Sequence, residues 1–148
     1  MRRKTHRGGF TLVELIIVIA ILAILTTIAV PSLQPFMAQR RLNGAARHVM
    51  SDLMNARMAA VSQNRDVQVT FPTSASAFYT YDTGGTALTR NLQTGFGYRD
   101  VTVAAAASPT FSSSGRLSGS GCTVILTSTT LGLTKTVTVN STGRVAIN

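Results

Sequence analysis

The chain of 148 residues is strongly basic, with 14 Lys and Arg against five Asp and Glu and a formal net charge of +9. This excess permits contact with DNA or an anionic surface but does not require either. A single cysteine, Cys122, excludes an intrachain disulfide, and tryptophan is absent. Two histidines and five acids leave little material for a catalytic or metal-binding cluster.

The N-terminus combines a basic leader with a long apolar run. Arg2, Arg3, Lys4 and Arg7 precede Gly9, and residues 10–30 then carry only one charge. As a helix rising about 1.5 Å per residue, this run would be about 31 Å long, which matches a hydrocarbon core of about 30 Å. The pattern predicts a membrane-spanning helix. The leader charges predict a cytoplasmic N-terminus, with the bulk of the chain on the other side.

Glu14 is the one charge inside the apolar run. A carboxylate near the middle of a bilayer costs roughly 2.5–3.5 kcal/mol on insertion scales, and somewhat less nearer the interface. A positive partner from another molecule would explain why the acid is there, so Glu14 predicts a subunit of an assembly. A cleaved signal peptide would have a shorter apolar core of about 7–15 residues. An uncleaved signal anchor stays as an alternative, although it leaves Glu14 unexplained.

The hexapeptide Gly9-Phe10-Thr11-Leu12-Val13-Glu14 resembles the processing site of type IV pilins and pseudopilins. The resemblance implies that prepilin peptidase cleaves between Gly9 and Phe10 and methylates the new terminus at Phe10. It also implies that Glu14 is the assembly residue, pairing with the terminal amine of a neighbouring subunit. Pro31 occupies the position of the helix-bending proline found in many members.

Residues 31–64 are predicted to continue the helix in amphipathic form. Apolar residues recur at steps of four and three, namely Leu42, Ala46, Val49, Leu53, Ala56 and Ala60. Pro31 and Pro35 predict a bend or local loosening, since proline removes a donor and clashes one turn back. His48 is expected on the helix surface. The methionines are expected to be adaptable packing residues rather than a metal site: Met37, Met50, Met54 and Met58.

Residues 65–148 are predicted to form a β-rich head. The expected strands are 67–71, 78–81, 97–104, 110–111, 122–127, 131–139 and 144–147, with turns at 83–86 and 140–143. Cys122 is expected as a buried thiol in its strand. The last two strands are expected to form a hairpin.

This second half is also similar to the GspH/FimT branch of minor pseudopilins. The similarity lies in Phe111-Ser112-Ser113-Ser114-Gly115-Arg116, in residues 136–147, and in Met54-Asn55-Ala56-Arg57. It implies an α+β fold, with a long N-terminal helix followed by an antiparallel head of two small sheets. The expected organisation is a cleaved leader (1–9), an assembly helix (10–30), its amphipathic continuation (31–64) and a periplasmic head (65–148).

Catalytic and metal-binding patterns are not found in the sequence. No serine lies in a G-x-S-x-G context, the aspartates are isolated, and residues 115–121 do not have the spacing of a phosphate-binding loop. We therefore expect no enzyme activity, no cofactor and no metal. Major pseudopilins usually carry an acid-rich calcium site near the C-terminus; no Asp or Glu follows Asp100, which favours a minor subunit.

The expected function is that of a minor pilin or pseudopilin with a tip or priming role in a type IV pilus or a type II secretion pseudopilus. The expected partners are other pilin-like subunits, prepilin peptidase and the assembly platform of the bacterial inner membrane. The alternative is a FimT-like DNA-binding minor pilin. Gly143-Arg144-Val145-Ala146 lacks the second arginine of the Gly-Arg-x-Arg motif of such proteins. Lys135 and Arg144 are candidates for a pair of DNA-contacting cations that lie close together across the final hairpin, with Arg116 or Arg99 nearby. The favoured interpretation is that these arginines are solvated surface residues.

Overall fold

The computed structural model describes residues 10–82 and 85–148, without the side chains of Ile28 and Val30. The chain divides into two compact units, Met1–Gln34 and Pro35–Asn148, and each is considered by itself. The cleavage-site residue Gly9 and the residues Thr83 and Gly84 of the predicted 83–86 turn lie outside the described residues.

Helix α1 (Leu12–Ser62) follows Phe10 and Thr11 and supplies the rest of the described part of the first unit. Its described apolar side chains there are exposed, because no other element lies in the described part of this unit. The hydroxyls in this stretch bond back to helix carbonyls, with Thr26 reaching Leu22 O at 2.9 Å and Thr27 reaching Ala23 O at 2.8 Å. Such internal pairing lets a polar side chain enter lipid without an unsatisfied group.

The described residues contain no single helix that is long and apolar enough to cross a membrane. The segments Leu12–Thr27 and Pro31–Ser62 meet the requirement as a broken pair, by length and composition alone.

In the second unit, one face of α1 is buried and forms the centre of the core. The predicted stripe is fully or almost fully buried: Leu42, Ala46, Val49, Leu53, Ala56 and Ala60. The helix ends where Asn64 adopts a positive φ of 50° and Arg65 N donates to Ala60 O at 3.1 Å. This left-handed residue with its six-to-one hydrogen bond is a common way to close a helix.

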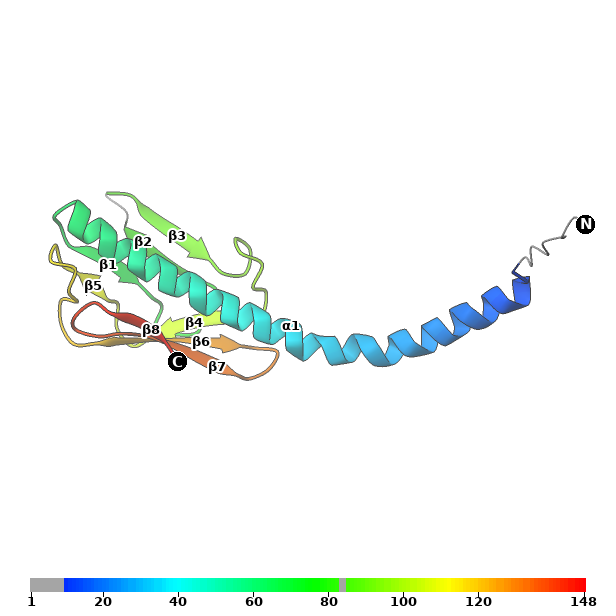
Figure 1. Cartoon of the computed structure of the whole chain (residues 1–148). Helices are drawn as coiled ribbons and strands as arrows, with labels where there is room; N and C mark the ends of the chain where they lie inside the picture. Colours follow the sequence, from blue (N-terminus) through cyan, green and yellow to red (C-terminus); the bar gives the residue numbers. More distant parts are fainter. Residues whose placement is uncertain (1–9, 83–84) are drawn as a thin grey trace, which may run out of the picture. The chain divides into compact units, whose positions relative to one another are not determined.

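Two antiparallel sheets complete the head (Figure 1). The first contains β1 (Val67–Thr70), β2 (Phe78–Asp82), β3 (Ala87–Asn91) and β5 (Thr110–Phe111), in the order β3-β2-β1-β5. The second contains β4 (Val101–Ala105), β6 (Cys122–Ser128), β7 (Thr134–Val139) and β8 (Val145–Ile147), in the order β4-β6-β7-β8. Alternate residues of β1, β4 and β6 are buried, so one face of each strand points into the core.

The predicted fold class is confirmed: a long helix precedes two antiparallel sheets. Cys122 is buried in β6 as predicted, with Sγ 2.9 Å from Ala107 O, and burial raises the pKa of its thiol. Strand β3 was not predicted. Two predicted strands begin too early, because residues 97–100 and 131–133 are irregular and the ladders start at Val101 and Thr134.

Two buried aspartates tie the sheets to α1. Asp52 of α1 accepts a hydrogen bond from Tyr79 Oη at 2.7 Å and lies 3.2 Å from Arg90 Nε. Burial, together with this hydrogen bond, raises the pKa of Tyr79 far above its ordinary value. In the second attachment the helix supplies the arginine: Arg41 Nε of α1 donates a hydrogen bond to Asp100, which lies just before β4.

Two expectations about α1 are wrong. His48 is half-buried rather than a surface residue, because its ring packs 4.4 Å from the ring of Phe96. Met37, Met54 and Met58 are exposed rather than packed in the core, since they lie on the faces of α1 that the sheets leave uncovered.

Candidate functional site

The beginning of α1 is capped from within the chain. Thr11 Oγ1 accepts a hydrogen bond from Glu14 N at 3.2 Å, and Thr11 O accepts one from Leu15 N at 3.2 Å. Thr11 therefore acts as the N-cap, with Glu14 at the third helical position, the spacing of a capping box. The role of Thr11 was missed in the sequence, although the Thr-x-x-Glu spacing would have revealed it.

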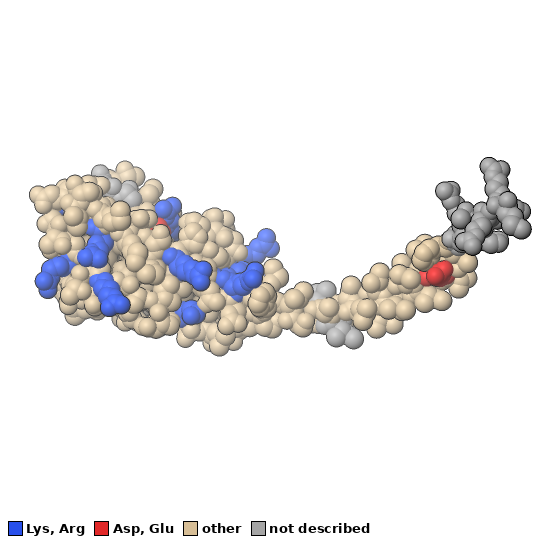
Figure 2. Space-filling model, viewed as in Figure 1, with Lys and Arg blue, Asp and Glu red and all other residues tan. Residues whose placement is uncertain are grey.

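Glu14 lies on an exposed, otherwise apolar surface. Phe10, Leu12 and Val13 beside it are also exposed, and no ion pair of Glu14 is found within residues 10–82 and 85–148. The helix N-terminus favours a carboxylate at this point, because its free N–H groups carry partial positive charge. Figure 2 shows an acidic side chain near the start of the helix, where the neighbouring described residues are uncharged.

Pro31 and Pro35 both lie inside α1. Pro31 belongs to the first unit and Pro35 begins the second. Ser32 Oγ donates to Ala29 O at 2.8 Å next to Pro31, so one carbonyl in this turn receives a side-chain partner. The role of Pro31 as a helix bend stays a prediction.

The basic residues named from the sequence do not form one group. Lys135 and Arg144 do not face each other across the final hairpin: Val139 pairs with Val145, and Val137 pairs with Ile147, so Lys135 lies at the opposite end of β7. The expectation that they lie together is wrong. Lys135 instead lines a groove of about 330 Å³ with Arg47, Asn43 and Ile147.

The structure places the turns that carry Arg116 and Arg144 next to each other through the neighbouring glycines. Gly115 and Gly143 are buried, and a side chain added to Gly143 would collide with the carbonyl oxygen of Gly115. Arg57 Nε donates to that same oxygen at 2.8 Å. One arginine of α1 thus holds two turns that each carry an exposed arginine, an arrangement that strand periodicity alone could not reveal. Figure 2 shows basic side chains distributed over the visible face of the head.

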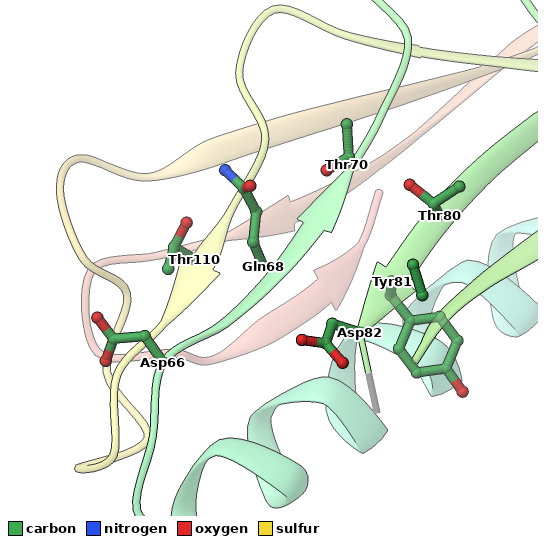
Figure 3. Close-up of a pocket in the computed structure, with 8 residues that line it drawn as sticks. Asp66, Gln68, Thr70, Thr80, Tyr81, Asp82 and Thr110 are labelled. Atoms are coloured by element: carbon green, nitrogen blue, oxygen red, sulfur yellow. The ribbon is translucent and has the colours of Figure 1, made fainter. Parts of the chain in front are cut away.

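A polar groove of about 320 Å³ lies on the outer face of the first sheet (Figure 3). Its lining includes Gln68, Thr70, Thr80 and Thr110, with Asp66 and Asp82 toward one side. Arg65 already pairs with Asp82 at 2.9 Å. The residues that the structure describes contain no group of three His, Cys, Asp or Glu able to hold a metal ion.

Known families account for both halves of the chain. The prokaryotic N-terminal methylation motif matches residues 4–30, which include the leader from Lys4 to Gly9 together with Phe10 and Glu14. The type II transport protein GspH family matches residues 45–143, more than half of the chain. The chain belongs to the GspH family. With the methylation motif, this family membership makes it a minor pilin or pseudopilin, and the pilin and pseudopilin families consist of structural subunits.

Solved structures of minor pilins share the fold of this GspH family member. The type IV minor pilin FimU of Pseudomonas aeruginosa PAO1 aligns with a TM-score of 0.60 and 19% identity, over 77% of this chain and 92% of FimU. A second crystal form of FimU aligns with a TM-score of 0.56 and 20% identity, over 72% of this chain and 92% of FimU. The minor pseudopilin EpsH from the type 2 secretion system of Vibrio cholerae aligns with a TM-score of 0.56 and 11% identity, over 73% of this chain and 96% of EpsH. No curated protein sequence matches the chain significantly.

Membership in the GspH family implies assembly with other pilin-like subunits and processing by prepilin peptidase, and the methylation motif with its apolar helix indicates a membrane-anchored pilin. None of these comparisons supports the DNA-binding alternative.

Proposed function

We propose that the chain is made as an inner-membrane precursor, cleaved between Gly9 and Phe10, methylated at Phe10, and then incorporated near the tip of a type IV pilus or type II secretion pseudopilus. The match of the methylation motif to residues 4–30 carries this proposal. The GspH match and the lack of any acid after Asp100 favour a minor rather than a major subunit.

Glu14 is the residue that drives incorporation. Exposed on an apolar helix, it has no counter-charge among the described residues, so its carboxylate is available to the free amine of a neighbouring subunit. Opposite charges attract strongly where helices exclude water, whereas an unpaired carboxylate there is costly. Removing the amine or the carboxylate would leave the other group unpaired.

The leader keeps the N-terminus in the cytoplasm, residues 10–30 span the inner membrane, and the head faces the periplasm. The assembly platform of the inner membrane supplies the other contact expected during incorporation. Pro31 lets the helix bend just beyond the apolar segment, because it removes one backbone donor there.

The test compares Glu14→Ala and Glu14→Gln with the unaltered protein in its native host. We expect both variants to reach the membrane and to be cleaved, but to appear in sheared pili or pseudopili at least about tenfold less, a loss of about 1.4 kcal/mol. Immunoblots of the membrane and sheared fractions provide the measurement. Mass spectrometry of the mature N-terminus verifies processing. Normal incorporation of Glu14→Gln would refute the charge-based mechanism, because Gln keeps the shape of Glu without its charge.

A further inference from the structure

An apolar groove of about 540 Å³ lies along the last turns of α1. Met54, Met58 and Val61 line it and recur at steps of four and three, so they share one helix face. They are 40%, 67% and 52% exposed, respectively. Methionine side chains are flexible and polarisable, which suits a surface that adapts to another protein.

The groove has a basic border. Arg57 lines it directly. A side chain on Gly115 would lie 3.0 Å from Cγ2 of Val61, so the turn that carries Arg116 adjoins the groove. Gly143 packs against Gly115 and Arg57, which brings the turn that carries Arg144 to the same border. Arg116 and Arg144 are both exposed.

Most acidic residues of the head already form ion pairs within the head. Residues 35–148 contain ten Lys and Arg but only four Asp. Asp52, Asp82 and Asp100 each form an ion pair with an arginine of the head. Within the described residues, this leaves Asp66 as the one acid of the head without an ion pair, so a second copy of the chain offers little negative charge to this basic border.

The groove lies far along the helix of the second unit. Met54 to Val61 lie 19–26 residues beyond Pro35 in the helix of the second unit, or about 28–39 Å at about 1.5 Å per residue. A partner bound at the groove would therefore leave the helix that enters the unit at Pro35 available for other contacts.

We propose that this groove is a docking site for an amphipathic segment of a different subunit, whose apolar side chains fill the space between Met54, Met58 and Val61 and whose carboxylates pair with Arg116 and Arg144. An amphipathic helix binds a groove of this kind through apolar side chains spaced three and four residues apart. Charges of opposite sign beside the apolar contact set the specificity. That the partner is a pilin-like subunit rests on the proposed function. The acidic, apolar character of the segment rests on the groove alone.

The binding test uses full-length protein in phosphatidylcholine nanodiscs, with empty nanodiscs as the blank. The probes are three fluorescent 18-residue helical peptides with one leucine stripe, flanked by Glu, Gln or Lys. Fluorescence anisotropy should show the Glu peptide binding at least about tenfold more tightly than the Gln and Lys peptides, with affinity falling as salt rises.

Exposed-site variants locate the binding surface. Met58→Asp and, independently, Val61→Asp should weaken binding of the Glu peptide at least about tenfold. Leu133→Asp is the matched control, because Leu133 is 50% exposed and lies in the turn before β7. Arg116→Ala/Arg144→Ala should weaken binding at least about fivefold, whereas Lys135→Ala/Arg99→Ala removes the same charge and should not.

Four results would overturn the proposal. These are equal binding of the three peptides, equal weakening by Leu133→Asp, tighter binding of a 20-nucleotide poly-dT that Met58→Asp does not affect, and self-association in analytical ultracentrifugation that Met58→Asp abolishes. The third result would indicate a nucleic-acid surface and the fourth a contact between copies. Glu14→Ala should bind the Glu peptide normally, so a failure of the assembly mechanism is measured separately from a failure of the groove.

Discussion

Asp100 is the ionisable residue whose environment gives the clearest pH dependence. Burial by itself raises the pKa of this carboxyl, but hydrogen bonds from Arg41 and Ser128 outweigh burial and hold the pKa below its ordinary value. The folded state therefore binds the proton less readily than the unfolded chain. The stability that Asp100 contributes is complete above the unfolded pKa of about 4 and is lost as the pH falls through the lower folded pKa.

We expect Asp100→Asn to lower the free energy of unfolding at pH 7 by about 1.5–3 kcal/mol, the range for hydrogen bonds to charged groups. Thermal melts between pH 2.5 and 7 would check this. The difference between the variant and the unaltered protein should shrink as the pH falls below about 4. Asp66→Asn is the control, since Asp66 is exposed. A constant difference at every pH would contradict the assigned ionisation.

Gly143 and Gly132 differ in their surroundings but share a left-handed backbone. Their φ angles are 80° and 65°. A methyl group on Gly132 would meet open space, whereas one on Gly143 would strike the carbonyl of Gly115. Left-handed geometry alone costs an alanine roughly 1–2 kcal/mol, and forced overpacking adds about 1–3 kcal/mol.

Gly143→Ala should therefore destabilise the head by about 2–5 kcal/mol, and Gly132→Ala by about 1–2 kcal/mol. Urea unfolding of the two variants beside the unaltered protein gives the comparison. Equal losses of unfolding free energy in the two variants would mean that the contact between the Gly115 and Gly143 turns is not rigid.

The buried face of α1 is the element on which the head depends most. Leu53 is fully buried in the core, whereas the next residue, Met54, is 40% exposed. Truncating a buried leucine removes transfer free energy and leaves a cavity, so Leu53→Ala should cost about 2–5 kcal/mol. Met54→Ala should change stability by less than about 0.5 kcal/mol. Chemical denaturation measures both, and similar losses would show that the helix faces are wrongly assigned.

Helix periodicity was sufficient to predict α1 and its core stripe, because burial on one face imposes a regular spacing. Strand β3 was not predictable in the same way. Residues Ala87–Asn91 are exposed or half-buried without alternation, so this edge strand carries no period-two signal. Its Arg90 lies 3.2 Å from Asp52, an attachment between residues far apart in sequence. The contacts of Arg57 with the Gly115 and Gly143 turns were not predictable either, because they also join residues that are far apart in sequence.

At the scale of the whole molecule, the N-terminal residues were informative because insertion into lipid and peptidase processing both act on a continuous segment. Gly9, Phe10 and Glu14 could therefore be proposed from the sequence, and their individual roles stay predictions. The basic surface could not, since hairpin register decides which arginines meet. That register separates Lys135 from Arg144, while turn packing places the turns that carry Arg116 and Arg144 side by side.

The orientation of the chain across the membrane can be tested with a single introduced thiol. Ser113 is exposed in the head, whereas Cys122 is buried, so the native thiol serves as an internal control. In spheroplasts, a membrane-impermeant maleimide should label Ser113→Cys and leave the unaltered protein unlabelled. Labelling of Ser113→Cys only after the inner membrane is lysed would place the head in the cytoplasm and contradict the proposed topology.

The cap at Thr11 has a consequence for maturation. Its hydroxyl and carbonyl receive the bonds from Glu14 and Leu15, and all three residues lie downstream of the cleavage proposed between Gly9 and Phe10. Cleavage at that peptide would remove none of these bonds, and the new amine would lie one residue before a first turn that is already capped. Under the proposed processing, the peptidase and the filament therefore contact the same preformed helix start, and maturation changes the charge of the terminus without refolding it.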